Sequence, residues 1–536
     1  MKRPVALLLA ALLAGPLSAQ SPPAGEETEP FGESIDVRVV NVETVVTDRE
    51  GKRVRGLTAG DFRLLVDGVE VPIDYFTEVA DGVALPAPRS VKEPAEADMP
   101  APAPSGPVGR SYLVFIDESL SIAAQRDIVL KELERDLDRL GPEDRMAVVA
   151  FDGGRLHRLV DWTGDRQALA GAFAEARQRP AGGILTLAER RSSLSDHQLL
   201  LELGGGSGEF DLYGTEWQPF DRYEDVDVQP QQYSRLVRVV EAAAAALRGF
   251  SLPAGRRAML VLSGGWPLTR PAARLVQDAN RLGYTLYPVD VPGIDIARTV
   301  GDASAERPMP GPARVLTSSW EVASHHTLHL LAEATGGREF LNSNRLAALE
   351  RADEDTRSYY WLGFSPAWKA DDRHHRIELE VRRPGLEVRA RSGFSDLSPV
   401  TLAEMETEGL LLFGIGGRPP GPLGGETRMQ VEMGEPRQAG WRTVEVPVTL
   451  MLPASAAAEG KETELVLSVG ALDRFGGRSE LPRIPLKVSL PEGAGPDAPV
   501  RSEVTLRLRK GEQKLVFHVR NSRTGSSLAS EVDYKP

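Results

Sequence analysis

The chain has 536 residues, 41% of them hydrophobic, and a formal net charge of −14. This acidic balance argues against nucleic-acid binding, which needs a basic face to displace phosphate counterions. There is no cysteine, which excludes disulfides, thiol chemistry and cysteine-ligated metals, so burial of apolar side chains must stabilise the domains.

The first residues predict a secretory signal peptide over 1–19. Met1-Lys2-Arg3 supplies positive charge, Val5 to Leu13 form a short apolar stretch, and Ser18-Ala19 are the small residues expected before a cleavage site. No later stretch approaches the roughly 18 apolar residues of a membrane span. We therefore expect a secreted, periplasmic or cell-envelope protein whose mature chain has no transmembrane segment.

Short β-rich runs separated by turn signals predict an N-terminal β segment over 35–80. Asp48-Arg49-Glu50-Gly51 and Asp67-Gly68 mark the expected hairpin turns. Residues 81–109 are rich in proline and alanine, which is typical of a semi-extended linker.

From residue 110 to 356 the pattern changes to alternating strands and helices, which predicts an α/β domain with a mostly parallel sheet. The buried strands are expected at 112–117, 146–151, 258–262, 285–291 and 337–341. The expected helices are 123–140, one ending near Leu247, 271–282, 325–334 and 344–355. A long insertion occupies 187–230.

Beyond residue 357 the hydrophobic period returns to two. Residues 357–396 predict a β segment that could pair with 35–80, since each is small alone. Residues 400–536 contain further alternating runs separated by glycine, proline and aspartate, which favours a C-terminal antiparallel β-sandwich.

The strand at 112–117 runs directly into Asp117-Glu118-Ser119-Leu120-Ser121. Loops at the carboxyl ends of parallel strands are where open α/β sheets bind ligands. Asp117 would supply charge, and Ser119 and Ser121 would supply neutral oxygens for a hard cation such as Mg²⁺. The structural alternative is that these residues cap the following helix and satisfy loop N–H groups.

Several motifs recur in the order seen in the von Willebrand factor A family, and the chain resembles the bacterial secreted proteins with a VWFA-related domain. The resemblance covers about residues 35–396. Its motifs are Asp117-x-Ser119-x-Ser121 and the segments 61–68, 332–338, 359–364 and 389–394. It implies a doubly wound, Rossmann-like parallel sheet flanked by β-domains.

The resemblance also implies a metal-ion-dependent adhesion site, in which Mg²⁺ or Mn²⁺ bridges the domain to an acidic side chain of a protein ligand. Asp117, Ser119 and Ser121 match the first motif, and Ser263 matches the later strand end. Gly264 stands where the family has a second aspartate, which predicts weak or absent metal binding. The family's threonine corresponds to Thr186 or Thr215, because Ile184 follows Gly182-Gly183 at the likely place.

Two further clusters carry weaker signals. Between residues 209 and 227 the insertion holds seven acidic residues and five aromatic ones, which could form a Ca²⁺ site or contact a partner, or could remain a solvated loop folded on its own domain. His325, His326 and His329 share a helix, but no glutamate completes a zinc-hydrolase motif, and surface histidines are the simpler interpretation.

We therefore expect a binding or adhesion protein rather than an enzyme. Its A-type domain would engage a protein partner, with or without a cation. The alternative is a metal-independent accessory or scaffold subunit of a cell-envelope enzyme or transport complex.

Overall fold

The protein is a mixed α/β chain with one mostly parallel sheet and several antiparallel sheets. The computed structural model describes residues 39–85, 106–184, 230–250, 253, 255–267, 269–292, 311–414, 429–454, 465–474, 476–479, 482–486, 499–521 and 526–535. The expected signal peptide, most of the expected linker and residues 187–229 of the insertion lie outside these ranges. Within them, no helix is long and apolar enough to span a membrane.

The central sheet has the strand order β11-β10-β7-β8-β9. Its strands are β7 (Arg110–Asp117), β8 (Arg145–Phe151), β9 (Leu156–Thr163), β10 (Arg256–Ser263) and β11 (Tyr284–Asp290). All neighbours pair in parallel except β9, which runs antiparallel to β8 at the edge. Every residue of β7 and β11 is buried, which accounts for their continuous apolar sequences.

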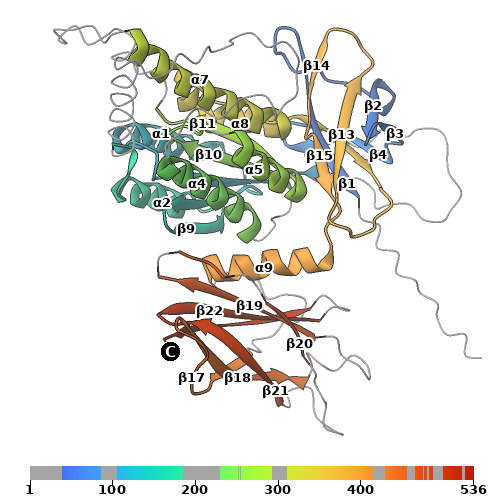
Figure 1. Cartoon of the computed structure of the whole chain (residues 1–536). Helices are drawn as coiled ribbons and strands as arrows, with labels where there is room; N and C mark the ends of the chain where they lie inside the picture. Colours follow the sequence, from blue (N-terminus) through green and yellow to red (C-terminus); the bar gives the residue numbers. More distant parts are fainter. Residues whose placement is uncertain are drawn as a thin grey trace, which may run out of the picture. The chain divides into compact units, whose positions relative to one another are not determined.

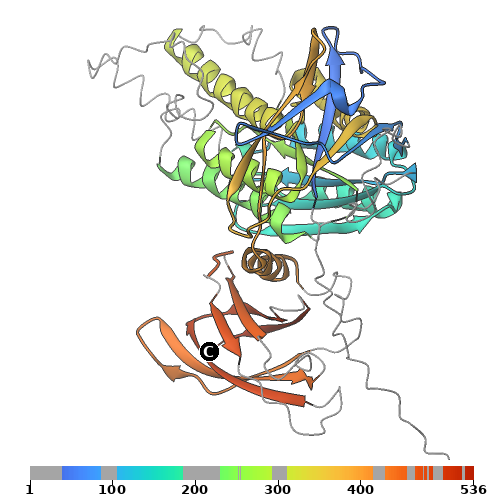
Figure 2. The same cartoon turned by 90° about the vertical axis from the view of Figure 1, so that its right-hand side faces the viewer.

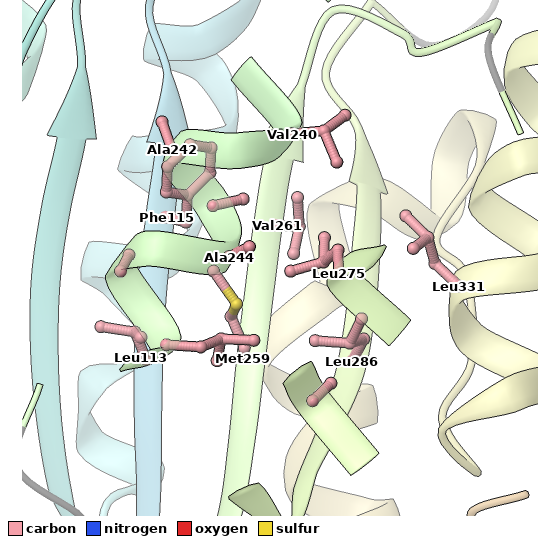
Figure 3. Packing of buried hydrophobic residues seen from close by; sticks show 14 of the residues in the cluster. Leu113, Phe115, Val240, Ala242, Ala244, Met259, Val261, Leu275, Leu286 and Leu331 are labelled. Carbon is pink, nitrogen blue, oxygen red and sulfur yellow. The ribbon is translucent and has the colours of Figure 1, made fainter. Parts of the chain in front are cut away.

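Helices cover both faces of this sheet (Figure 1). One face packs on α1 (Ala123–Arg135), α2 (Arg166–Gln178) and α8 (Ala348–Arg357). The other packs on α4 (Pro230–Gly249), α5 (Thr269–Leu282) and α7 (Gly311–Ala334). Alternate residues of β7 therefore enter different cores, and Figure 3 shows Leu113 and Phe115 against the alanines of α4.

Three expected elements differ in the structure. The helix expected to reach residue 140 ends at Arg135 and continues as a short 3₁₀ helix, Asp136–Arg139. The prediction of a strand at 337–341 is wrong, because within this range only Phe340 forms a β-bridge, with Val289. The helix expected at 344–355 begins as 3₁₀, Asn342–Ala347, before α8.

Strands from before and after the parallel-sheet domain share two sheets. β1 (Val40–Asp48) lies between β12 (Tyr359–Phe364) and β14 (Leu386–Arg389), and β12 also pairs with β4 (Tyr75–Ala80). β2 (Phe62–Val66) pairs with β13 (His374–Val381) and with β3 (Val69–Val71). The blue and orange strands lie side by side in Figures 1 and 2. The short strands are β5 (Val83–Ala84), β6 (Gly106–Pro107) and β15 (Gly393–Ser395).

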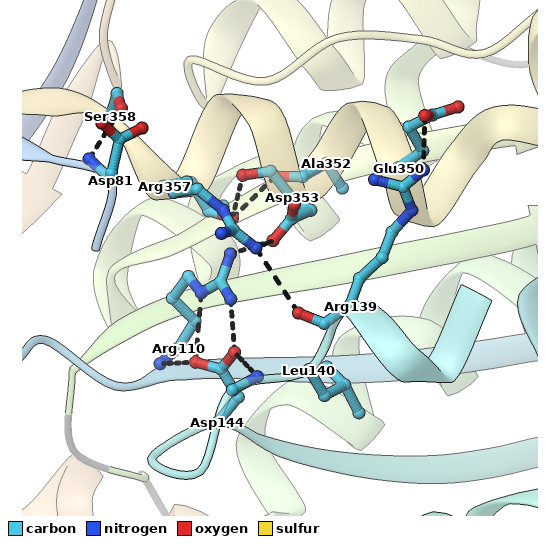
Figure 4. A network of polar contacts seen from close by, with 12 residues as sticks. Asp81, Arg110, Arg139, Leu140, Asp144, Glu350, Ala352, Asp353, Arg357 and Ser358 are labelled. Atoms are coloured by element: carbon cyan, nitrogen blue, oxygen red, sulfur yellow. Dashed lines mark hydrogen bonds and ion pairs between the residues drawn. The ribbon is translucent and has the colours of Figure 1, made fainter.

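Buried ion pairs hold α8 to the start of the sheet (Figure 4). Arg110, at the beginning of β7, contacts Asp144 before β8 and Asp353 on α8. Its backbone N–H also donates to Asp144 at 2.9 Å. All three side chains are less than a tenth exposed. If one partner moved away, the other charge would be left buried without a partner, which is costly in free energy. These contacts therefore hold α8 in its position.

A second acidic residue of α8 reaches the flanking β strands. The Asp355 carboxylate accepts from Arg53 at 2.7 Å and from Arg389 of β14 at 2.9 and 3.0 Å. Burial alone would raise the pKa of Asp355, but Arg389, Arg53 and Arg338 outweigh it and hold the pKa below its usual value. The α/β core and the flanking strands are thus joined through one ionised carboxylate.

The C-terminal region begins with a helix, α9 (Pro399–Phe413), where the sequence analysis expected only β structure from residue 400. Ser398 caps it by accepting from the Thr401 N–H, and Pro399 occupies its first turn. Two antiparallel sheets follow, and their inward side chains form one hydrophobic core. The first contains β16 (Gln430–Met433), β17 (Arg437–Gln438), β18 (Thr443–Pro453) and β21 (Pro499–Arg509). The second contains β19 (Leu465–Asp473), β20 (Arg483–Leu486), β22 (Gln513–Asn521) and β23 (Ser527–Tyr534).

Candidate functional site at the carboxyl edge of the parallel sheet

Three loops meet at the carboxyl edge of the central sheet. One follows β7 and carries Asp117 to Ser121, one follows β10 from Ser263, and one follows α2. The loop after α2 is tied to the first, because Gly182 N–H donates to Glu118 O at 2.8 Å and Gly183 N–H to Ser121 O at 2.9 Å. The edge therefore collects the residues that the sequence analysis singled out from distant parts of the chain.

Asp117 lies at the centre of this edge and is fully buried. Its Oδ1 accepts from the Ser119 N–H at 3.1 Å, the Ser119 hydroxyl at 2.8 Å and the Leu120 N–H at 3.1 Å. Its Oδ2 accepts from the Ser263 hydroxyl at 2.8 Å and from the Trp266 indole N–H at 3.3 Å. The protein thus supplies five neutral donors to one carboxylate.

The electrostatics of Asp117 follow from this environment. Burial raises the pKa of its carboxyl, and the hydrogen bonds from Ser119, Ser263, Leu120 and Trp266 act in the opposite direction. A carboxylate has about four lone-pair sites, so five donors saturate it. The pKa nevertheless stays above its usual value, so the hydrogen bonds offset the cost of burying this charge only in part.

Glycines allow the three loops to approach at backbone distance. A Cβ on Gly264 would lie 2.0 Å from the Leu120 carbonyl oxygen, and one on Gly183 would lie 2.5 Å from Ser121 backbone atoms. The sequence analysis treated Gly264 as a lost metal-ligating aspartate. The geometry shows that an aspartate there requires the backbone of one loop to move, since no side chain fits the present spacing.

The described residues fit a cation poorly. No group of three or more histidine, aspartate or glutamate side chains suited to a metal ion occurs among them. Asp117 already accepts hydrogen bonds from the Ser119 and Ser263 hydroxyls, although these bonds leave the oxygen lone pairs of both serines uncommitted. The Ser121 hydroxyl and the Glu118 Oε2 are both buried in this loop with no hydrogen-bond partner. Thr186 and Thr215, the two candidates for the remaining ligand, lie outside the described residues.

A buried glutamate and two arginines, which the sequence analysis did not single out, anchor the loop after α2. Glu118 Oε1 accepts from Arg179 Nε at 2.7 Å. Arg126 is fully buried and donates to the carbonyls of Arg177 and Arg179 at 3.2 and 3.1 Å. Burial raises the pKa of Glu118, and Arg179 and Arg126 oppose that shift. These contacts join residues more than 50 positions apart, so no local pattern reveals them.

Ile184 is the last described residue of the segment that these contacts hold. Ile184 is 65% exposed, directly after the two glycines that touch the Asp117 loop. It occupies the position at which the family resemblance would place a metal-ligating threonine.

Two of the three histidines of α7 lie beside carboxylates. His325 Nε2 lies 3.3 Å from Asp290 Oδ2, and His329 Nδ1 lies 3.2 Å from Glu339 Oε1. Burial and the neighbouring His329 lower the pKa of His326. The rings do not converge on one point, which favours the surface interpretation over a zinc site. The acidic and aromatic cluster of the insertion lies outside the described residues.

Comparison with known proteins adds a weak structural similarity. No protein-family model matches the chain, and no curated protein matches its sequence. A solved structure that it resembles is titled "Crystal Structure of the SpRpn10 VWA domain", with 11% sequence identity and a TM-score of 0.16. The match covers 39% of this chain and 93% of that one. At such a TM-score the similarity carries no conclusion about function.

Proposed function

We propose that the chain is an extracytoplasmic binding protein without catalytic activity, whose parallel-sheet domain engages a protein partner without a bound cation. The proposal includes the narrower fold assignment, a doubly wound A-type domain followed by a β-sandwich. One observation carries it: five donors from the chain itself saturate Asp117. The chain's own hydrogen bonds thus hold the described loops around Asp117.

The contact is assigned to the loop after α2. Open α/β sheets bind their ligands at the carboxyl edge of the strands. Ile184 is exposed there, and Arg126 and Glu118 hold the residues that precede it. A pre-ordered apolar side chain loses little entropy on binding, which suits it as an anchor in the pocket of a partner. A scaffold subunit of an envelope complex is the role that such a surface fits.

The experiment replaces Ile184 with a photo-reactive phenylalanine analogue and irradiates the protein in an envelope extract of the producing cells. The matched control carries the same analogue at Val69, which is 66% exposed on a flanking strand. We expect a discrete crosslinked partner from position 184, absent from position 69 and unchanged by EDTA. Equal crosslinking at both positions, or none at 184, would overturn the proposal.

Cation-dependent adhesion is the second candidate, and one observation favours it. The Ser121 hydroxyl is fully buried without a hydrogen-bond partner, and such an orphan atom calls for an explanation. In that case Ser119, Ser121 and Thr186 would hold Mg²⁺ or Mn²⁺ beside Asp117 and Ser263, and the ion would attract an acidic side chain of the partner. Loss of the Ile184 crosslink in EDTA, restored by Mg²⁺, would select this candidate.

A further inference from the structure

The hairpin tip between β17 and β18 presents a tryptophan to solvent. Trp441 is 82% exposed, the highest value among the exposed large hydrophobic residues of the described chain. The tip is held in shape, because the N–H groups of Ala439 and Gly440 donate to Thr443 O at 3.2 and 3.1 Å. The Arg442 guanidinium stacks 4.6 Å from the centre of the indole ring.

Cationic side chains surround this tip on both neighbouring strands. Within the first C-terminal sheet, Thr443 lies opposite Arg509, and Glu445 lies between Arg437 and Arg507. The Lys510 N–H donates to Arg442 O at 2.9 Å, which brings the end of β21 against the tip. We call the exposed residues Arg437, Trp441, Arg442, Arg507, Arg509 and Lys510 the tip patch. It gathers five cationic side chains around one exposed carboxylate, Glu445, on a chain whose formal net charge is −14.

A cavity of about 370 Å³ adjoins the tip patch. Arg509 and Lys510 line both, and Arg474 and Lys535 add further positive charge to the cavity. Lys535 is paired with Glu512 at 2.7 Å. Asp473 also lines the cavity, whose volume falls in the range of roughly 300–1,000 Å³ that is typical of small-ligand sites.

We propose that the tip patch docks on the surface of an anionic phospholipid bilayer, with Trp441 entering the headgroup region. Tryptophan is favoured at the membrane–water interface, where its ring is partly apolar and partly polar. Each lysine or arginine near an anionic surface adds to the attraction, and buried apolar area adds to this electrostatic term. The cations lie to either side of the indole ring of Trp441. A bilayer surface can contact the ring and these cations at the same time, whereas a protein pocket that receives the ring would have to match the position of each cation. This inference goes beyond the proposed function, since it concerns different elements and a different partner.

The test is sedimentation of the purified chain with vesicles of phosphatidylcholine, with and without phosphatidylglycerol. We expect binding only to the vesicles that contain phosphatidylglycerol, weakened by added salt. Trp441→Ala should weaken that binding by about tenfold, because burial of one large apolar side chain is lost. Trp441→Phe should remove any vesicle-induced blue shift of the tryptophan emission.

The charge requirement has a matched control on the same strand. Arg509→Glu reverses a charge in the tip patch and should weaken vesicle binding by about thirtyfold. Arg501→Glu makes the same change on the same face of β21, roughly 27 Å away and beyond the screening length, and should leave binding unchanged. Equal effects of the two variants, or equal binding to both vesicle types, would overturn the proposal. Saturable binding of polyglutamate through Trp441 without vesicle binding would also overturn it, in favour of an acidic protein partner.

Discussion

Asp117→Asn tests whether the carboxyl edge is held by hydrogen bonds of the chain itself. Asparagine keeps one oxygen for the three donors on Oδ1, and its amide then faces Ser263 and Trp266. The Ser263 hydroxyl can turn and accept, but the indole N–H of Trp266 can only donate. One buried donor is therefore stranded, which costs about 1–3 kcal/mol of unfolding free energy. In a Trp266→Phe background no donor is stranded, so the same substitution should cost less by about that amount.

The assay is a double-mutant cycle of the native chain, the two single variants and the double variant. Urea unfolding is followed by circular dichroism in EDTA, so that no cation contributes. The predicted coupling between the two substitutions is about 1–3 kcal/mol, and Trp266→Phe alone adds only the cost of a smaller side chain. Additive effects, or an Asp117→Asn variant as stable as the native chain, would refute the assignment of Trp266 as a donor to Asp117.

Three further substitutions follow from the same contacts. Gly264→Ala should destabilise the chain by about 1–3 kcal/mol in urea unfolding, because its Cβ would press on the Leu120 carbonyl; a native-like midpoint would contradict this. Gly171→Ala, in an exposed part of α2 with open space around it, should instead stabilise by about 0.5–1 kcal/mol. The Asp355 pKa is lower in the folded chain than in the unfolded chain, so the unfolded chain takes up the proton first and stability falls as the pH drops below about 4. In the Asp355→Asn variant the free energy of unfolding should fall less steeply as the pH drops. The measurement is urea unfolding at several pH values, and a slope equal to that of the native chain would contradict the ion-pair assignment.

The mixed α/β character and the mostly parallel sheet could be predicted because strands buried on both faces have continuous apolar sequences. β7 is such a strand, and its expected end at Asp117 is confirmed. The edge strand β9, with the sequence Leu-His-Arg-Leu-Val-Asp-Trp-Thr, is only half-buried along its length and was missed because it shows no clear alternation. Helix α9 was also missed, although Ser398-Pro399 is a helix-start signal.

The site shows a different limit of sequence analysis. The carboxyl-edge position of Asp117 and Ser263 follows from the strand pattern, and the structure brings them within hydrogen-bond distance. The donor role of Trp266, 149 positions from Asp117, depends on how two loops pack and has no local signature. The absence of an aspartate at 264 was visible in the sequence, but the backbone contact that excludes a side chain was not. Metal binding by these residues stays a prediction.

Isothermal titration of Mn²⁺ and Mg²⁺ into the purified chain, beside Asp117→Asn, tests the cation-independent edge most directly. We predict no saturable heat from the native chain and no rise in its unfolding free energy with added cation. A working site would stabilise the folded chain by about 2.7 kcal/mol at a cation concentration 100 times the Kd. Saturable binding that is lost in Asp117→Asn would contradict the proposal and establish a cation site despite Gly264.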